Sequence, residues 1–361
     1  MKYFACGSCQ KQIFFSKTAC DHCSVRIGYV AERKEMLSFK EVTADIWQAL
    51  DIHVRGEEFK PCYNYQNYHV CNWVLPQGSD EIYCESCQLT YIIPQLDKEE
   101  NIIYWRRLEH AKQRFLYLAQ RLNIMPKPKR HDQDRFGLRF NFLMPLNDQP
   151  VMTGHGQGII TLNAHEANVV YRETTRINMG ENYRTLLGHF RHESGHYYFY
   201  LIENLRPDLL DEFRTYFGDE RQDYAAALDQ HYENGPPIDW EQSYISTYAS
   251  AHPWEDWAET WAHYLHMMET LETAYYAGLA VNADQPDLSN LIMNECPIGS
   301  NNFEHLLESW ITLTFNLNAL NRSIGLEDAY PFNLSEIVKD KLRFIHRHLL
   351  DLAFNSEINF T

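Results

Sequence analysis

Apolar side chains recur every three or four residues in several long stretches of the chain, the spacing that places them on one face of an α-helix. The clearest stretch covers 101–123. Its periodic residues are Trp105, Leu108, Ala111, Phe115, Leu118 and Leu122. Similar patterns predict helical structure over 204–235 and two closing helices over 303–321 and 334–353. The pattern therefore predicts a mainly helical chain.

Shorter stretches follow a different pattern. Apolar and polar residues alternate over 137–143, which predicts a strand, and 158–163 is a second candidate strand. The connector over 24–60 is expected to contain two short helices, near 33–38 and 43–50. Combined with the long helices, these elements predict an α+β fold, in which a mainly helical domain with a small mixed sheet follows smaller N-terminal modules.

Length and charge narrow the class of protein. At 361 residues, the chain has room for two or three domains. Its net charge is −17, and residues 1–98 contribute −2 of it, from 10 Lys and Arg against 12 Asp and Glu, so residues 99–361 carry −15. A field of this sign repels nucleic acid and anionic membranes, and it favours cationic or neutral substrates.

The expected compartment follows from what the sequence lacks. No stretch approaches the about 18 consecutive apolar residues of a transmembrane helix. The first residues lead directly into a cysteine motif, without the apolar segment of a signal peptide. We therefore expect a cytoplasmic protein. In that reducing compartment, paired cysteines are expected to bind metal rather than to form disulfides.

Two closely spaced cysteine pairs occur at the N-terminus, Cys6-x₂-Cys9 and Cys20-x₂-Cys23. Each pair suits the tip of a short hairpin, and two such knuckles can supply four thiolates to one tetrahedral zinc ion. Four protein ligands leave no open coordination position, so this zinc is expected to be structural. The motif predicts a zinc ribbon over residues 1–32.

A second group of four cysteines follows, with less regular spacing. Its members are Cys62, Cys71, Cys84 and Cys87. The last two have knuckle spacing, whereas the first two are separated by eight residues, and His69 could replace one thiol. We predict a second structural zinc here, in a connector and ribbon-like module over 33–98. The alternative is that some of these thiols are simply buried, as free cysteines often are. Cys296 is expected to lie in the core.

Residues 192–196 read His-Glu-Ser-Gly-His, in a stretch without proline whose apolar residues recur at a helical period. Residues i and i+4 lie on the same face of a helix, so His192 and His196 can bind one zinc ion. Glu193 between them can then deprotonate a water molecule at the open position.

A catalytic zinc needs a third protein ligand, and 58 residues separate His196 from the best candidate. Glu255 and Glu259 lie at i and i+4 of a helix that Pro253 would begin. Glu255 is the expected ligand, Glu259 would hydrogen-bond a zinc-bound histidine, and Asp256 is the rival ligand. The alternative interpretation is an acidic, solvated helix N-terminus that the helix dipole favours.

The segments 183–198, 217–224 and 248–267 are similar to those of the bacterial "putative zinc-binding metallopeptidase" family. Members resemble this chain from end to end, including an N-terminal zinc-ribbon region. The resemblance implies a zinc-dependent hydrolase of the broad Glu-zincin group, with a zincin-like metallopeptidase domain over 99–361. In zincins, the strand before the metal-binding helix often borders the cleft and pairs with an extended substrate.

This chemistry assigns a role to each residue of the site. Neutral His192 and His196, with Glu255, would hold one catalytic zinc, and Glu193 would accept the proton of the attacking water and return it to the leaving amine. The oxyanion needs a further donor, for which we expect Tyr248. Other candidates are Tyr232, His231 and His252. His189 is expected to be buried or to support the site, because a fourth ligand would close it.

The predicted function is zinc-dependent hydrolysis of peptide bonds, with one catalytic and one or two structural zinc ions. Its substrate would be a peptide or protein, and the ribbons could contact a protein partner. One alternative is a protein-interaction module or pseudo-peptidase that binds zinc without catalysis. A DNA-associated protease is a further alternative, which the acidic charge disfavours because neutralising phosphates takes clustered Lys and Arg.

Overall fold

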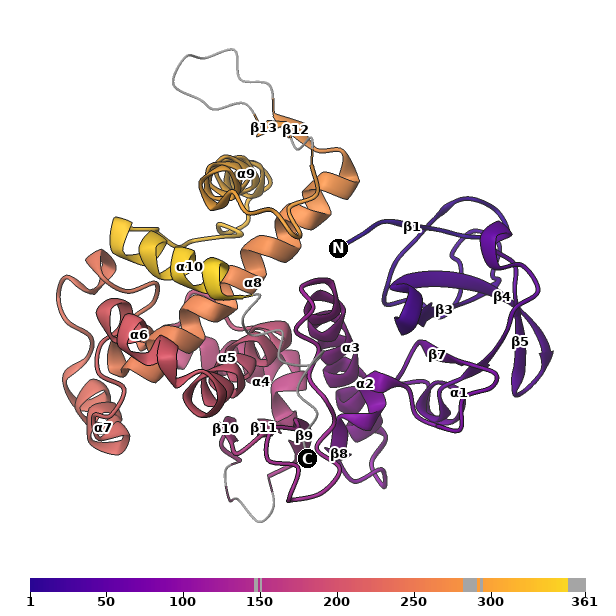
Figure 1. The fold of residues 1–361 in the computed structure, drawn as a ribbon, viewed down its shortest axis with the longest axis horizontal. Coiled ribbons are helices and arrows are strands. Elements are labelled where there is room, and N and C mark those ends of the chain that lie inside the picture. The colour runs from indigo at the N-terminus through magenta and orange to yellow at the C-terminus, as the bar shows by residue number, and fades with distance from the viewer. Residues whose placement is uncertain (146–148, 150, 282–290, 293–294, 350–361) are drawn as a thin grey trace. The chain divides into compact units, whose positions relative to one another are not determined.

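The computed structural model describes residues 1–145, 149, 151–281, 291–292 and 295–349. The chain forms two compact units (Figure 1). The N-terminal unit comprises Lys2–Arg121 and Met125–Phe190. The C-terminal unit comprises Leu122–Ile124 and the chain from Arg191 onwards, together with Met1. Among the helices described, none is long and apolar enough to cross a membrane. The predicted domain boundaries at 32 and 98 stay a prediction.

The N-terminal unit begins with the antiparallel hairpin of β1 (Phe4–Ala5) and β2 (Gln12–Ile13), whose tip carries the first cysteine pair. A bridge between Ala19 and Arg26 closes the loop that carries the second pair. The two knuckles expected from the spacing of the cysteines are therefore present.

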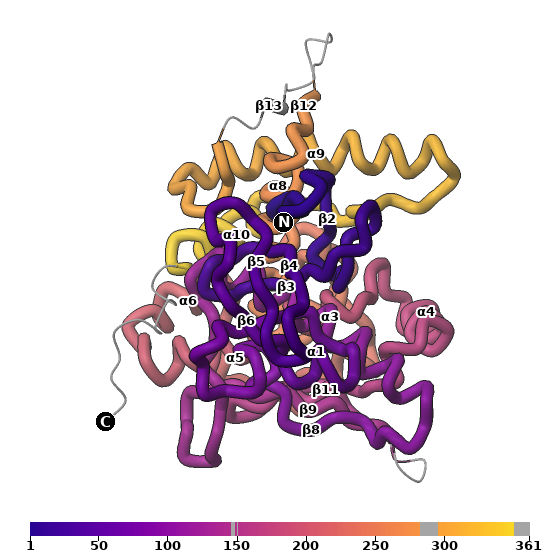
Figure 2. The backbone as a smooth tube through the Cα atoms, turned by 90° about the vertical axis from the view of Figure 1, so that its right-hand side faces the viewer, coloured from indigo at the N-terminus to yellow at the C-terminus, as the bar shows by residue number. Residues whose placement is uncertain are grey.

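A closed five-stranded barrel follows, in the order β3-β4-β5-β6-β7. Its strands are β3 (Arg26–Val30), β4 (Glu35–Thr43), β5 (Ile46–Ala49), β6 (Glu58–Pro61) and β7 (Trp73–Pro76). Figure 2 shows β3, β4, β5 and β6 side by side. The helices predicted near 33–38 and 43–50 are wrong, because β4 and β5 occupy these residues. Short apolar runs do not distinguish helix from strand. Here the pairing of β4 with β3 on one side and with β5 on the other fixes the strand conformation.

The rest of the N-terminal unit combines a long helix with a small mixed sheet. The helix predicted over 101–123 is confirmed as α3 (Glu99–Arg121). The sheet has the order β10-β11-β9-β8, and only β10 and β11 pair antiparallel. Its strands are β8 (Thr90–Ile92), β9 (Arg139–Leu143), β10 (Gly154–Gly156) and β11 (Ile159–Asn163). Both predicted strands, β9 and β11, are confirmed. However, β11 is an interior strand, and β10 forms the edge beside it.

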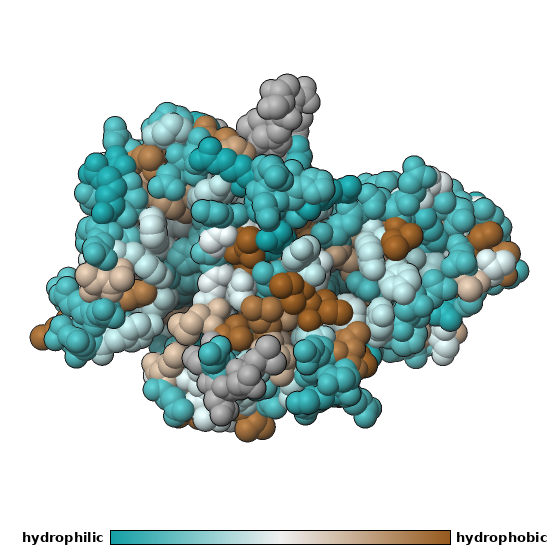
Figure 3. Space-filling view, turned by 90° about the horizontal axis from the view of Figure 1, so that it is seen from below, coloured by the Kyte–Doolittle hydropathy of each residue, from teal (hydrophilic) through white to brown (hydrophobic). Residues whose placement is uncertain are grey.

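Shorter helical segments complete the described part of this unit. They are α1 (Tyr63–Tyr68), α2 (Glu85–Gln88), α4 (Val169–Asn178) and the 3₁₀ turns Ala31–Arg33, Ile52–Val54 and Ala164–Ala167. Helix α4 buries none of its residues and leaves Val170 and Ile177 more than half exposed. Apolar groups among hydrophilic residues are also visible on the face drawn in Figure 3.

The C-terminal unit is helical. Its long helices are α5 (Leu186–Leu205, which belongs to this unit from Arg191), α8 (Pro253–Ala277), α9 (Phe303–Ser323) and α10 (Glu336–His348). Its shorter elements are α6 (Leu210–Phe217), α7 (Tyr224–Asn234), the 3₁₀ turns Pro207–Leu209, Trp240–Gln242 and Tyr248–Ala251, and the strands β12 (Ala280–Val281) and β13 (Leu291–Ile292). The predicted closing helices correspond to α9 and α10, except that 350–353 lie outside the described residues. The helical region predicted over 204–235 is interrupted at Gly218, whose φ of 93° is incompatible with a continuing helix.

The core of the C-terminal unit forms around α8, which packs against α6, α9 and α10. Phe213 and Phe217 of α6 stack on each other and contact Trp257 of α8 and Phe344 of α10. Burial of such large rings supplies most of the packing energy. The structure is thus about half helical with small sheets, and the zincin-like character of the helical domain stays a prediction.

Candidate metal centres

Helix α5 places both histidines of the 192–196 motif on one face. The imidazole centroids of His192 and His196 lie 4.9 Å apart, and their Nε2 atoms are separated by 3.2 Å. Glu193 lies between them in the sequence and is only 5% exposed. The expected helical spacing therefore brings two metal-competent nitrogens together.

Glu255 reaches these nitrogens from the first turn of α8. This helix begins at Pro253, and the Nδ1 atom of His252 caps it by accepting a hydrogen bond from the backbone N–H of Trp254 at 3.1 Å. Oε2 of Glu255 lies 3.1 Å from Nε2 of His192 and 3.4 Å from Nε2 of His196. Ligand atoms bound at about 2.0–2.1 Å to a tetrahedral zinc ion lie roughly 3.3 Å apart. The three side chains thus have the separations of a zinc ligand set.

A close approach of α8 to α5 makes this meeting possible. A Cβ atom on Gly195 would lie 2.8 Å from the Cα atom of Ala258, so only glycine fits at this contact. Two buried indoles bind α5 beside it, since Trp257 donates to the carbonyl of Gly195 at 2.8 Å and Trp261 donates to the hydroxyl of Ser194 at 3.0 Å. The two residues between Glu193 and His196 therefore dock the second helix.

The carboxylate of Glu255 fits a metal ligand in its hydrogen bonding and its charge. Oε2 is buried, and no group in the described part of the chain donates a hydrogen bond to it. Burial alone would raise the pKa of Glu255, but the imidazoles of His196 and His192 outweigh it and hold that pKa well below its ordinary value. An ionised carboxylate with an unsatisfied buried oxygen is what a zinc ion would complete.

Glu259 lies one turn after Glu255 and fixes the orientation of the first histidine. Its Oε1 atom is 2.7 Å from Nδ1 of His192, and its Oε2 atom accepts a hydrogen bond from the hydroxyl of Ser246 at 2.7 Å. Burial tends to raise the pKa of Glu259, but the contact with His192 lowers it. Because a carboxylate only accepts, Nδ1 carries a proton, so Nε2 is the nitrogen of His192 that can bind a metal ion.

Asp256, the rival ligand, is engaged elsewhere. Its Oδ2 atom lies 2.6 Å from Nζ of Lys341, and both side chains are almost completely buried. Burial raises the pKa of Asp256 to about 7, although Lys341 opposes the rise. Among the described residues, the group that could hold a metal contains Glu255 and not Asp256. Lys341, a residue of the last helix, α10 (Glu336–His348), is thus a core residue.

Of the residues proposed to bind the oxyanion, Tyr248 lies beside the motif, and His231 lies beside Tyr248. The Tyr248 ring lies 6.0 Å from the His192 ring, and the His231 ring lies 6.2 Å from the Tyr248 ring. Tyr232 is 67% exposed. His252 caps α8 and also contacts the carbonyl of Gln222 at 3.3 Å, so its position is structural.

The phenol of Tyr248 remains protonated at any physiological pH. Burial and then the charge of Glu255 raise its pKa far above the ordinary value, and the charge of Glu193 contributes as well. A half-buried phenol that senses both carboxylates is a hydrogen-bond donor close to the reacting groups.

Tyr224, the first residue of α7, is a residue of the site that the sequence patterns did not indicate. Its hydroxyl donates a hydrogen bond of 2.7 Å to Oε1 of Glu255, the oxygen that faces away from the histidines. One feature of the sequence could have indicated a role for Tyr224, because it is the last residue of the segment 217–224 that resembles the family. Tyrosines are frequent in this chain, and the sequence contains no spacing that links residue 224 to residue 255.

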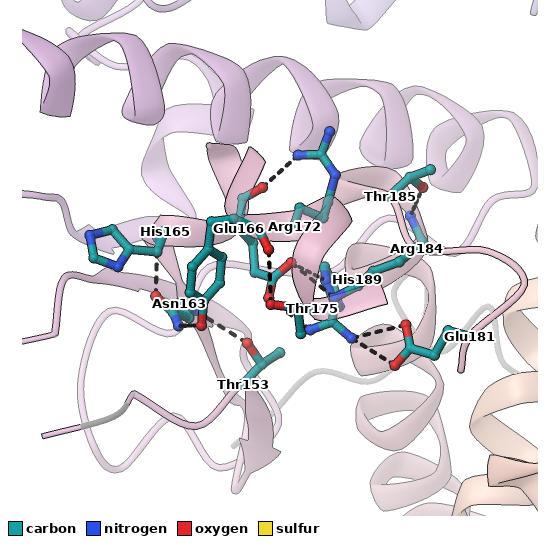
Figure 4. Close-up of polar contacts among 12 residues, drawn as sticks. Thr153, Asn163, His165, Glu166, Arg172, Thr175, Glu181, Arg184, Thr185 and His189 are labelled. Atoms are coloured by element: carbon teal, nitrogen blue, oxygen red, sulfur yellow. Dashed lines mark hydrogen bonds and ion pairs between the residues drawn. The ribbon is translucent and has the colours of Figure 1, made fainter. Parts of the chain in front are cut away.

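His189 belongs to a different cluster, in the N-terminal unit. Figure 4 shows the side chain of Glu166 beside those of His189 and Arg184. The Glu166 carboxylate accepts from Arg184 at 2.7 Å and lies 3.2 Å from Nε2 of His189. Burial opposes ionisation of Glu166, but His189 and Arg184 outweigh it and lower its pKa to about 2. The expectation that His189 is not a fourth ligand agrees with this pairing.

The four N-terminal cysteines, here called the first cysteine cluster, converge as predicted. Sγ of Cys6 lies 3.7 Å from Sγ of Cys23, and Sγ of Cys9 lies 3.7 Å from Sγ of Cys20. Thiolates bound at about 2.3 Å to a tetrahedral zinc ion lie roughly 3.8 Å apart. The thiols of this cluster differ in exposure, and Cys23 is exposed to solvent.

The second cysteine cluster consists of Cys62, Cys71, Cys84 and Cys87, all of them buried. Nitrogen donors surround its sulfurs: Sγ of Cys71 accepts from Gln113 of α3 at 3.1 Å and from the backbone of Trp73 at 3.3 Å. His69 is not a member, since its ring contacts the carbonyl of Tyr65. Cys296 is half-buried and belongs to neither cluster.

Comparisons with known proteins agree with both halves of this description. Residues 101–348 match the family described as "Putative zinc-binding metallo-peptidase", and residues 3–98 match a zinc-ribbon domain. The chain is 38% identical over 356 residues to "Uncharacterized protein Mb2598c" of Mycobacterium bovis and to "Uncharacterized protein Rv2568c" of Mycobacterium tuberculosis, which covers 98% of this chain and 96% of each relative. No solved structure matches the chain.

Proposed function

Because this chain belongs to the family described as "Putative zinc-binding metallo-peptidase", we propose that it is a zinc-dependent hydrolase of peptide bonds. The ligands in this proposal are His192, His196 and Glu255. The observation that carries it is the convergence of two imidazole nitrogens on a buried carboxylate oxygen, at 3.1 and 3.4 Å, to which no described residue donates a hydrogen bond. Without a cation, this arrangement would leave a buried acceptor unsatisfied.

The zinc ion would supply the positive charge that acidifies a water molecule and polarises the scissile carbonyl. Glu193 accepts the proton of that water and passes it to the departing amine, and its position between the two histidines on α5 suits this role. Three protein ligands leave one coordination position open, whereas each cysteine cluster supplies four.

Tyr248 is the residue we propose as the oxyanion donor. It lies half-buried in the 3₁₀ turn Tyr248–Ala251, and it keeps its proton because desolvation and the charge of Glu255 raise its pKa. A phenolic O–H that donates where negative charge develops stabilises the transition state more than the ground state. His231, beside Tyr248, is the second candidate. Burial lowers its pKa, so it is neutral at physiological pH.

The two cysteine clusters are proposed to hold structural zinc. Their eight thiols suit a reducing compartment, and on this ground we propose a cytoplasmic location. A protein partner that binds the zinc ribbon also belongs to the proposal, as does the absence of a nucleic-acid partner. The acidic charge of residues 99–361 favours a neutral or cationic peptide substrate.

The test compares wild type with Glu193→Gln. The amide cannot accept the proton, but the zinc ligands are unchanged, so zinc content should stay the same while cleavage of a peptide library falls by about 10²–10⁴-fold. Glu203→Gln is the matched control, because Glu203 is an exposed residue of the same helix. Equal cleavage by Glu193→Gln and wild type would remove the proposed mechanism. A bound zinc ion without an exchangeable water molecule would instead favour a zinc-dependent protein-interaction module.

A further inference from the structure

The two oxygens of the Glu255 carboxylate have different surroundings. Oε2 faces the imidazoles of His192 and His196. Oε1 accepts a hydrogen bond from the hydroxyl of Tyr224, at 2.7 Å. The carboxylate is 1% exposed, so solvent does not replace either partner. The protein therefore distinguishes between two atoms that are chemically equivalent in a free carboxylate.

This difference matters for the number of coordination positions. A carboxylate can bind zinc through one oxygen or through both. Binding through both would occupy a second position at the metal and crowd the one that a water molecule needs. A hydrogen bond to Oε1 stabilises negative charge on that oxygen and fixes the carboxylate plane, which favours binding through Oε2 alone.

We propose that Tyr224 is a positioning residue that restricts Glu255 to one-oxygen ligation and thereby keeps a coordination position open for water. This inference rests on the proposed function, because it requires a zinc ion at His192, His196 and Glu255. It goes beyond that function in assigning a role to a residue that need not touch the metal or the substrate.

The segment around Tyr224 is built to hold this position. Asp223 caps α7 by accepting from the backbone of Ala226 at 3.1 Å, which sets the first turn where Tyr224 lies. Two residues earlier, the carbonyl of Gln222 contacts His252, the residue that caps α8. The starts of α7 and α8 are therefore connected twice, once through His252 and once through the carboxylate of Glu255.

Tyr248 and Glu193 are further polar neighbours of the Tyr224 hydroxyl. Glu193 is a carboxylate, which accepts hydrogen bonds and does not donate them. Helix α7 buries no residue, so removing one oxygen atom should leave the core intact.

The experiment measures zinc affinity and open-site binding in zinc-loaded, full-length protein. Tyr224→Phe removes only the hydroxyl. We expect the affinity for the weakest-bound zinc to fall about 10–100-fold in competition with a chromophoric chelator, and the affinity of acetohydroxamate, which needs vacant positions at the metal, to fall roughly tenfold. Tyr275→Phe is the control, because Tyr275 is a half-buried tyrosine of α8 distant in sequence from the ligands, and it should change neither value.

A double-mutant cycle with Glu255→Gln separates positioning from general stabilisation. If Tyr224 acts through Glu255, Tyr224→Phe should add little to the loss of zinc affinity already caused by Glu255→Gln. Full additivity, or unchanged zinc and hydroxamate affinities in Tyr224→Phe, overturns the inference alone. If Glu255→Gln contains as much zinc as wild type, the proposed function is overturned and, with it, this inference.

Discussion

The second cysteine cluster and the site formed by His192, His196 and Glu255 are both candidates to hold zinc, but their ligands differ in number and in exposure. The latter is here called the His/Glu site. In the cluster, all four sulfurs are buried, and nitrogen donors surround Cys71. In the His/Glu site the carboxylate is buried, but the imidazole side chains remain 15% and 17% exposed. A closed shell of four ligands suits a structural ion, whereas three ligands with access to solvent suit chemistry.

The two sites also depend on the fold differently. Cys84 and Cys87 are neighbours along the chain, and their knuckle spacing fixes their relative position locally. The His/Glu site needs α8 to return after 58 residues and to dock at Gly195. A metal that joins local pairs is expected to create the fold around it, while a metal bound between packed helices uses a fold that already exists.

The largest expected effect tests this contrast directly. Cys84→Ala should lose one zinc and unfold the N-terminal unit, because a structural zinc contributes about 10 kcal/mol or more, which is comparable to the stability of a whole domain. Glu255→Ala should lose one zinc and keep its helices. Zinc analysis together with hydrogen exchange measures both effects. A Cys84→Ala protein that lacks zinc but keeps protected amides in the barrel would break the comparison.

The buried pair of Asp256 and Lys341 tests whether packing positions the His/Glu site. Lys341→Met leaves the carboxylate beside Glu255 without its partner and should destabilise the C-terminal unit by about 3–5 kcal/mol. Chemical denaturation measures this change. Lys339→Met, on the same helix with an exposed partner, should change stability by about 0.5 kcal/mol or less. Equal effects of the two substitutions would show that the pair does not anchor α10 to α8.

Gly195→Ala addresses the contact between α5 and α8 itself. The added methyl group would collide with the backbone of Ala258 and should cost about 1–3 kcal/mol of stability through overpacking. Zinc affinity at the His/Glu site should fall, while the cysteine clusters keep their metal. Gly154→Ala serves as the control, because the space around Gly154 is open. Unchanged zinc affinity in Gly195→Ala would mean that α8 tolerates displacement.

The smallest expected effect is a change in stability with pH, caused by the ionic contacts of Glu166 with Arg184 and His189. The folded-state pKa of Glu166, about 2, lies below its ordinary value of 4.5. Its ionisation therefore stabilises the N-terminal unit above about pH 4.5, and this contribution is lost as pH falls towards 2. The difference in urea midpoint between wild type and Glu166→Gln should shrink from about pH 6 to about pH 3. A constant difference would contradict the assignment.

Sequence patterns correctly predicted the helices whose formation depends on residues close together in the chain. The apolar period of α3, the His-Glu-Ser-Gly-His motif of α5 and the proline at the start of α8 each predicted a helix that the structure contains. The strands β4 and β5 were mistaken for helices, because a short apolar run carries no period that separates the two conformations. In the barrel, β4 pairs with β3 and β5, and β5 also pairs with β6. The sequence of either strand alone does not show which strands it pairs with.

The sequence by itself determined the donor groups that lie close together along the chain, namely the two imidazoles of the His/Glu site and the cysteine pairs with knuckle spacing. Spacing places two imidazoles on one helical face and two thiols on one knuckle, since both geometries arise within a few residues of backbone. Only the tertiary structure decided the rest. It brought Glu255 rather than Asp256 to the imidazoles, turned Lys341 inwards, and set Tyr224 against the free oxygen of Glu255. These choices depend on how α5, α7, α8 and α10 pack together, and packing joins residues that no local spacing connects.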